Sequence, residues 1–269
     1  MMSETSMNKS LAAIVCGMPF SGTTFLSRLI CAHPKIDAGF ECGMLLGKSP
    51  KNFPEAGRFY DWMMDKRPPY NWNLTKEEMD DICSSPTFDE AYDRIVDHCH
   101  LFQGDVKYVL DKTPVYVYLL KSIMRRMPET PVIVIEKEKL NQYYSFKKRD
   151  QSLDFFEERY VNSQQAIDEV LAKRGLKKRL LRLPFEEAVN SPAKTYRKVI
   201  NFINRYNPDI AFEKSQVALL KESMKEDMKG KKKLRTEYSI EDERQKMLNA
   251  LSDEERTRIE KLEYNFQNA

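Results

Sequence analysis

The chain has 269 residues, 41% of them hydrophobic, so it is long enough to bury a core as one substantial domain or two small ones. Its 44 lysines and arginines nearly balance 41 aspartates and glutamates, and the formal net charge is only +3. This balance gives no indication of a nucleic acid partner, and we expect a single domain over residues 1–269.

Signals for a membrane or an oxidising compartment are not evident. The N-terminal run MMSETSMNKS is polar and lacks the apolar centre of a signal peptide, and no apolar stretch approaches the roughly 20 residues of a membrane span. The five cysteines are scattered and form no C-x-x-C pair, a pattern typical of reduced thiols. We therefore expect a soluble cytoplasmic protein without a membrane partner.

The first predicted element is a buried strand over Leu11–Cys16, followed by a turn over Gly17–Thr24 and an amphipathic helix. The turn has the glycine spacing of a phosphate-binding P-loop, but Thr23 stands where nucleotide triphosphatases have lysine. In such a turn backbone N–H groups converge on an anion, and Gly22 allows close approach. Without the lysine, the loop favours a 5′-phosphate or phosphosulfate over metal-assisted triphosphate chemistry. The alternative is an ordinary strand-to-helix turn.

Further strands and helices alternate along the chain. The later strand-like runs are Tyr108–Leu110, Val132–Ile135 and Arg179–Leu183. This alternation predicts an α/β fold in three layers, a parallel sheet flanked by helices. The region from about 50 to 103 departs from the pattern and is predicted to be a helical insertion over the ligand edge of the sheet. The tail from about 239 to 269 is predicted as two helices, the second beginning at a capping box of Ser252 and Glu255.

Lysines follow two of the predicted strands. The run DKTP at residues 111–114 places Lys112 after one strand, and the run EKEK at 136–139 places Lys137 after the next. Ligands of an open parallel sheet bind beyond the carboxyl ends of its strands, so both lysines are candidate contacts for an anionic ligand. For Lys112 the structural alternative is pairing with Asp111 or with a helix C-terminus.

Several ordered motifs resemble those of sulfotransferases that use 3′-phosphoadenosine 5′-phosphosulfate (PAPS). The family's 5′-phosphosulfate loop, P-[KR]-S-G-T-T-x-L, is matched by PFSGTTFL from Pro19, and its D/E-K-[TS]-P-x-Y segment is matched by LDKTPVYV from Leu110. In the 3′-phosphate motif an arginine is followed eight positions later by a serine, and this spacing selects Lys137 and Ser145 in VIVIEKEKLNQYYS. Two later segments, one beginning LRLPFEE and the other LSDEERTRIEKLEY, complete the resemblance. It extends from Leu11 to about residue 263.

The resemblance implies a P-loop NTPase-like sulfotransferase fold with a helical insertion, closest to bacterial, carbohydrate and tyrosylprotein members. It also implies a set of nucleotide-binding residues. These are Ser21, Gly22, Thr23 and Thr24 for the 5′-phosphosulfate, Phe25 as a wall of the pocket, Lys137 and Ser145 for the 3′-phosphate, and Lys229 and Gly230 as a late basic loop. The default interpretation of the basic run around Lys229 is a solvated helix end, because charge runs usually face water.

Two residues are implied to be catalytic. Glu41 falls where related members carry a catalytic glutamate, so we expect it to act as general base on the acceptor, with a pKa raised by burial. A surface or helix-capping carboxylate is the alternative. Phe20 replaces the loop Lys or Arg of the family, a loss of roughly 3 kcal/mol in transition-state stabilisation. We therefore expect Lys112 to be the principal catalytic cation.

The function implied is transfer of a sulfuryl group from PAPS to a hydroxyl or amine, with adenosine 3′,5′-bisphosphate (PAP) as product and no metal required. Two alternatives are a PAP-binding homologue impaired by Phe20 and, disfavoured by the missing loop lysine, a P-loop kinase. We expect a small-molecule, carbohydrate or peptide acceptor under a cover that includes residues 53–70, Trp62 and Trp72. The tail helices are a possible homodimer contact.

Overall fold

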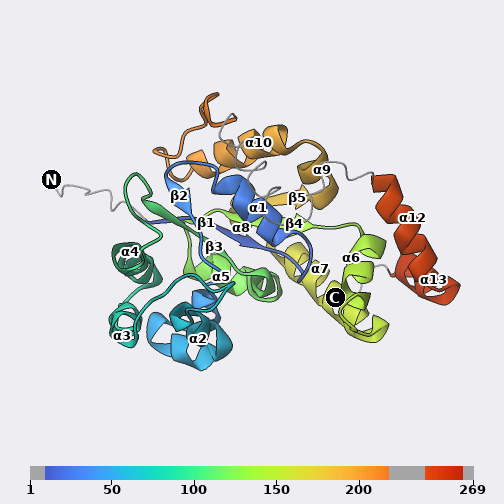
Figure 1. Ribbon diagram of the computed structural model, residues 1–269, viewed down its shortest axis with the longest axis horizontal. Helices are drawn as coiled ribbons and strands as arrows, with labels where there is room; N and C mark the ends of the chain where they lie inside the picture. The colour runs from blue at the N-terminus through green and yellow to red at the C-terminus, as the bar shows by residue number, and fades with distance from the viewer. Residues whose placement is uncertain (1–9, 218–239, 263–269) are drawn as a thin grey trace.

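The computed structural model describes residues 10–217 and 240–262. In this part of the chain five parallel strands form one sheet in the order β2-β3-β1-β4-β5 (Figure 1). The strands are β1 (Leu11–Cys16), β2 (Ile36–Asp37), β3 (Tyr108–Lys112), β4 (Val132–Glu136) and β5 (Leu180–Pro184). In the centre, Ile14 of β1 pairs with Asp111 of β3 and Val132 of β4. The parallel α/β sheet predicted from the alternating pattern is confirmed, with β2 as an additional short edge strand.

Helices connect the strands. The α-helices are α1 (Thr23–Ile30), α2 (Arg58–Met64), α3 (Lys76–Cys83), α4 (Phe88–His98), α5 (Leu120–Arg126), α6 (Lys139–Lys147), α7 (Leu153–Leu171), α8 (Arg174–Lys177), α9 (Phe185–Asn190), α10 (Pro192–Asn204), α12 (Ile240–Ala250) and α13 (Asp253–Lys261). Three 3₁₀ helices are η1 (Met44–Leu46), η2 (Pro50–Ala56) and η3 (Pro114–Leu119).

Both faces of the sheet are covered, which explains why β1 is apolar throughout. Ile14 and Cys16 belong to a core with α2, α3, α4, α5 and α7, whereas Ala13 and Val15 belong to a core with α1 and α10. Figure 1 shows α1, α9 and α10 on one side of the sheet and α2 to α5 on the other. Full burial of an aliphatic side chain of this size stabilises the fold by about 1.5–3 kcal/mol. Because all the strands run parallel, their carboxyl ends lie at one edge of the sheet.

The predicted insertion contains η2, α2, α3 and α4, and most of it covers a face of the sheet. Phe53 and Trp72 are 0% and 1% exposed within the same core as Ile14. Trp72 Nε1 also donates a hydrogen bond to the backbone oxygen of Phe40. These two aromatic side chains, which we expected on the acceptor side, are therefore core residues, and Trp72 also fixes the chain around Phe40.

The tail helices α12 and α13 pack against α6 of the same chain. Met247, Leu251 and Ile259 form a third core with Tyr143 and Phe146. The predicted capping box is present: the Ser252 side chain accepts from the Glu255 N–H, and the Glu255 side chain accepts from the Ser252 N–H. These helices thus support α6 from outside.

Candidate active site

The turn after β1 needs glycine at two positions. A Cβ on Gly17 would lie 2.4 Å from the backbone oxygen of Ile135, and one on Gly22 would lie 2.2 Å from the ring of Phe185. Gly22 also has a φ of +101°, in the left-handed region that glycine adopts without strain. The close approach of β4 and Phe185 therefore gives a physical reason for the glycine spacing.

The same turn presents hydrogen-bond donors at the start of α1. This helix begins at Thr23 and has no acidic residue in its first turn. The Ser21 hydroxyl is buried without a hydrogen-bond partner, Thr23 is buried and Thr24 is exposed. A helix N-terminus with free N–H groups and adjacent hydroxyls is a favourable place for a phosphate or sulfonate.

A cleft of about 550 Å³ opens beside this turn, beyond the carboxyl ends of the strands. It is lined by Pro19, Phe20, Gly22, Thr23, Thr24, Glu41, Arg58, Pro114, Val115, Lys137, Ser145, Lys148 and Arg149. Four of these side chains are cationic and one, Glu41, is acidic. Such a surplus of positive charge concentrates anions, and it suits a ligand with several phosphate or sulfate groups.

Lys137 and Ser145 meet in the cleft. Lys137 directly follows β4 and Ser145 lies on α6, and the Lys137 Nζ donates to the Ser145 Oγ at 3.1 Å. The Glu138 side chain caps α6 by accepting from the backbone N–H of Leu140 and Asn141, which fixes the turn between the pair. The structure thus brings together two residues that the eight-residue spacing selected.

Phe185, which the sequence did not suggest, links this pair to the loop. Its ring lies beside Gly22, 5.1 Å from the Lys137 Nζ, and edge-on to Phe25 with ring centroids 6.0 Å apart. Phe25 packs towards the α1 and α10 core and is not among the residues that line the cleft. Lys229 and Gly230 lie outside the described residues.

Glu41 and Lys112 form the other end of the site. The Lys112 Nζ lies 3.6 Å from the Glu41 Oε1 and 4.9 Å from the centre of the Phe40 ring. Burial raises the pKa of Glu41, an effect that the Lys112 charge opposes. Burial also lowers the pKa of Lys112, and Glu41 opposes that shift in turn. Glu41 lines the cleft, whereas Lys112, at the end of β3, does not line it and instead contacts Glu41.

A fully buried carboxylate, Asp111, holds this end in place. It accepts hydrogen bonds from the hydroxyls of Tyr92 at 2.5 Å, Thr113 at 2.8 Å and Tyr116 at 2.9 Å. The Thr113 and Tyr116 hydroxyls in turn accept from the backbone N–H of Gly43 and Leu45, each at 2.9 Å. Burial raises the pKa of Asp111, and the three hydroxyl donors oppose that rise. Asp111 therefore positions the segment that carries Glu41 and is itself shielded from the cleft.

Comparison with known proteins decides the family. Residues 13–209, well over half of the chain, match the model described as the sulfotransferase family. The chain belongs to this family. The sulfotransferase domain of the olefin synthase from Synechococcus PCC 7002 is similar in structure, with a TM-score of 0.53 and 18% identity over 77% of this chain and 76% of that chain. The sulfotransferase domain from the curacin biosynthetic pathway is also similar, with a TM-score of 0.52 and 15% identity over 77% of this chain and 76% of that chain.

At these identities the likeness to solved structures shows the fold alone, and it confirms the sulfotransferase fold predicted from the ordered motifs. No curated protein matches the chain significantly. Among the described residues, no helix of this sulfotransferase is long and apolar enough to cross a membrane.

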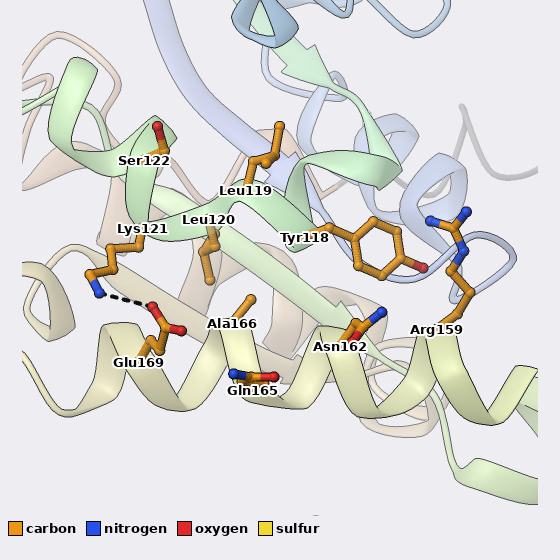
Figure 2. A pocket seen from close by; sticks show the side chains of 10 residues that line it. All are labelled: Tyr118, Leu119, Leu120, Lys121, Ser122, Arg159, Asn162, Gln165, Ala166 and Glu169. Carbon is orange, nitrogen blue, oxygen red and sulfur yellow. Dashed lines mark hydrogen bonds and ion pairs between the residues drawn. The ribbon is translucent and has the colours of Figure 1, made fainter. Parts of the chain in front are cut away.

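A second cavity, of about 400 Å³, lies between the η3–α5 segment and α7 (Figure 2). Tyr118 and Lys121 reach it from one side and Arg159 and Glu169 from the other, and the Lys121 Nζ is 2.9 Å from Glu169. None of the site residues that the sequence suggested lines this cavity. Six of these residues line the cleft beside the loop instead, namely Gly22, Thr23, Thr24, Glu41, Lys137 and Ser145, whereas Ser21, Phe25 and Lys112 do not.

Proposed function

We propose that this sulfotransferase transfers a sulfuryl group from PAPS to a hydroxyl or amine acceptor and releases PAP. One observation carries the proposal: the loop, the Lys137–Ser145 pair and Glu41 all line the same cleft. A donor with phosphates at both ends of its ribose needs two separate anion sites, and we propose one at the start of α1 and another formed by Lys137, after β4, and Ser145 on α6.

The residues of the cleft and of the adjoining loop fit such a donor. The orphaned hydroxyl of Ser21 and the N-terminus of α1 would bind the 5′-phosphosulfate, which approaches closely because Gly22 has no Cβ. Lys137 and Ser145 would bind the 3′-phosphate, with lysine giving charge but not the bidentate geometry of arginine. PAPS itself supplies the activated sulfuryl group.

Glu41 is proposed as the general base. A carboxylate whose pKa is raised by burial accepts a proton from an alcohol more readily than an ordinary one does. Lys112 does not line the cleft, but its Nζ lies 3.6 Å from the Glu41 Oε1, and we propose that it positions this base and adds positive charge behind the reacting groups, in place of the principal catalytic cation that we expected. The proton of the acceptor would move to a carboxylate oxygen of Glu41 as the acceptor attacks sulfur.

The acceptor is proposed to lie over the half-buried aromatic side chains beside Glu41. Trp62 and Tyr70 stack with centroids 5.3 Å apart, and Phe40 meets them edge-on at 5.3 and 5.2 Å. Such faces suit a sugar or a flat apolar molecule, whereas Arg58, 5.3 Å from the Trp62 ring, suits an acidic group. A small molecule, a carbohydrate and a peptide are all compatible with this surface.

Five free thiols support a cytoplasmic location.

Thermal unfolding with PAP, compared with ATP and Mg²⁺, tests the donor class. PAP at 100 times its Kd should stabilise the fold by about 2.7 kcal/mol, or about 5–10 °C in Tm, with no comparable shift from ATP and Mg²⁺. A larger shift with ATP and Mg²⁺ would favour the kinase alternative.

Radiolabelled transfer from PAPS to a phenol, an amino sugar and a tyrosine-containing peptide then tests turnover. Product from any of them supports the proposed enzyme. Binding of PAP without product from a broad acceptor panel would favour the second candidate, a nucleotide-binding homologue, for which Phe20 in the loop is the specific observation.

A further inference from the structure

Phe20 occupies an unusual place in the loop. Its φ is +68°, in the left-handed region that bulky residues rarely adopt, and its side chain is 37% exposed at the cleft. The ring is held edge-on against Phe146 of α6, with centroids 5.2 Å apart. A strained backbone with a large apolar side chain at the rim of a polar cleft points to a role for the ring itself.

That ring carries a cation on its open side. The guanidinium carbon of Arg149 lies 3.9 Å from the centre of the Phe20 ring, and Arg149 Nη1 donates to the backbone oxygen of Ser145 at 2.8 Å. A guanidinium has five N–H donors, so the bond to Ser145 leaves others for a ligand. Arg149 lines the same cleft as Thr24, Lys137 and Glu41.

The loop itself has no charge to offer an anion, which makes the position of Arg149 important. The run GMPFSGTT over Gly17–Thr24 contains no charged residue, so any charge that the loop offers an anion must come from elsewhere. Lys137 is engaged with Ser145, and Lys112 is buried with Glu41 and does not line the cleft. Among the described cations that line the cleft, Arg149 is the one with its guanidinium stacked on a side chain of the loop.

We propose that Arg149, stacked on Phe20, contacts the transferring sulfonate and acts as a catalytic cation; this inference rests on the proposed function. In the transfer step the acceptor oxygen forms a bond to sulfur while the bond from sulfur to the 5′-phosphate oxygen breaks. The electron pair of that bond leaves with PAP, and the acceptor proton goes to Glu41. Arg149 forms no covalent bond, and its N–H groups stabilise the charge on the equatorial sulfonate oxygens and the departing oxygen.

The test compares Arg149→Ala with Arg197→Ala in the full chain. Arg197 is a matched control because it is an exposed arginine whose guanidinium carbon lies 5.5 Å from the Phe212 ring, away from the cleft. We expect Arg149→Ala to lower kcat about 100-fold and to change the Kd for PAP less than about threefold, with neither changed in the control. Arg149→Lys should recover part of the loss because it keeps the charge without the planar stacking.

A second variant tests the platform. Phe20→Leu should lower kcat by a smaller factor, and the double variant Phe20→Leu/Arg149→Ala should be no slower than Arg149→Ala alone, because the ring acts through the arginine. If Phe20→Leu lowered kcat by the same factor in the Arg149→Ala background as in the wild type, the two effects would be independent and this dependence would be contradicted. An Arg149→Ala kcat near that of the wild type would overturn the proposal, as would an equal loss of PAP affinity, which would assign Arg149 to the 3′-phosphate.

Calorimetric titration with PAPS and PAP separates this inference from the proposed function, since it needs no turnover. The wild type should prefer PAPS over PAP, and Arg149→Ala should lose that preference if the guanidinium contacts the sulfonate. A wild type without transferase activity but with this Arg149-dependent preference would contradict the proposed function alone. Active transfer that is indifferent to Arg149 would contradict this inference alone.

Discussion

The two ends of the cleft are built by different means. The proposed nucleotide end consists of backbone N–H groups at the start of α1 and two side chains eight residues apart, Lys137 and Ser145, that meet between β4 and α6. The acceptor end brings Glu41 and Lys112 together from distant segments and holds them through hydrogen bonds to the buried Asp111. Local geometry therefore forms the proposed nucleotide site, and a tertiary network positions the proposed base. The two functions should be separable by mutation.

Replacement of the proposed base should have the largest effect. Glu41→Gln keeps the shape of the side chain but cannot accept a proton, so we expect kcat to fall about 10²- to 10⁴-fold. PAP affinity should stay within about threefold of the wild type by calorimetry, because the nucleotide end is unchanged. Glu169→Gln, which alters a carboxylate outside the cleft, is the control. A Glu41→Gln enzyme with near-normal kcat would remove Glu41 from the chemistry.

Removal of a charge from the nucleotide end should have the opposite effect, lowering PAP affinity while largely retaining kcat. Lys137→Met deletes a cation that would bind the 3′-phosphate, and hydrogen bonds to charged groups are worth about 1.5–3 kcal/mol, or roughly 10- to 100-fold in Kd. Calorimetry with PAP should show this loss, and kcat at saturating PAPS should fall far less. Lys121→Met, beside the second cavity, is the matched control. Unchanged PAP affinity would place the 3′-phosphate elsewhere.

The pH dependence should report the coupling within the acceptor end. Glu41 must be ionised to act as a base, and burial raises its pKa, so activity should fall at a higher pH than the usual carboxyl range as the solution is acidified. In Lys112→Met the opposing positive charge is gone, so the acid limb of the kcat profile should move to still higher pH. We also expect its plateau to fall less than in Arg149→Ala. An acid limb that stays in place would show that the two groups do not interact.

Much of the nucleotide end could be predicted because its parts are contiguous in the chain. The strand, glycine turn and helix around Gly17–Thr24 are one local unit, and the lysine-serine spacing brings Lys137, directly after β4, to Ser145 on α6. The sequence could not show Phe185 against Gly22 or Arg149 on Phe20, because these contacts depend on how α6 and α9 pack beside the sheet.

The acceptor end was harder to predict because its contacts depend on tertiary packing. Glu41 and Lys112 were recognised individually by resemblance, but their contact depends on the packing of β3 against the segment around Gly43. Asp111, considered as a partner for Lys112, instead accepts from three hydroxyl groups. Trp72, expected beside the acceptor, is buried in the core. The sequence alone does not distinguish an aromatic side chain of a binding surface from one of the core. The short strand β2 has too few residues for a periodic pattern.

The smallest effect should come from the outer support of the nucleotide end. Glu255 of α13 accepts from the Tyr143 hydroxyl at 2.6 Å and pairs with Lys147 at 2.7 Å, and both partners lie on α6, which carries Ser145. Burial raises the pKa of Glu255, but the bonds from Lys147, Tyr143 and the Ser252 N–H outweigh it and hold the pKa at about 2. At this partly solvated site the pair should stabilise the fold by about 0.5–1 kcal/mol.

Glu255→Gln should therefore lower the free energy of unfolding by about that amount at pH 7, measured by urea denaturation, with PAP affinity nearly unchanged. Because the folded pKa lies below the unfolded one, the contribution is complete above the ordinary glutamate pKa of about 4.3 and disappears as the pH falls towards 2. Glu187→Gln, on α9, is the control. A large loss of PAP affinity in Glu255→Gln would mean that α13 determines the position of Ser145 and Arg149, and the nucleotide end would then depend on tertiary contacts as much as the acceptor end does.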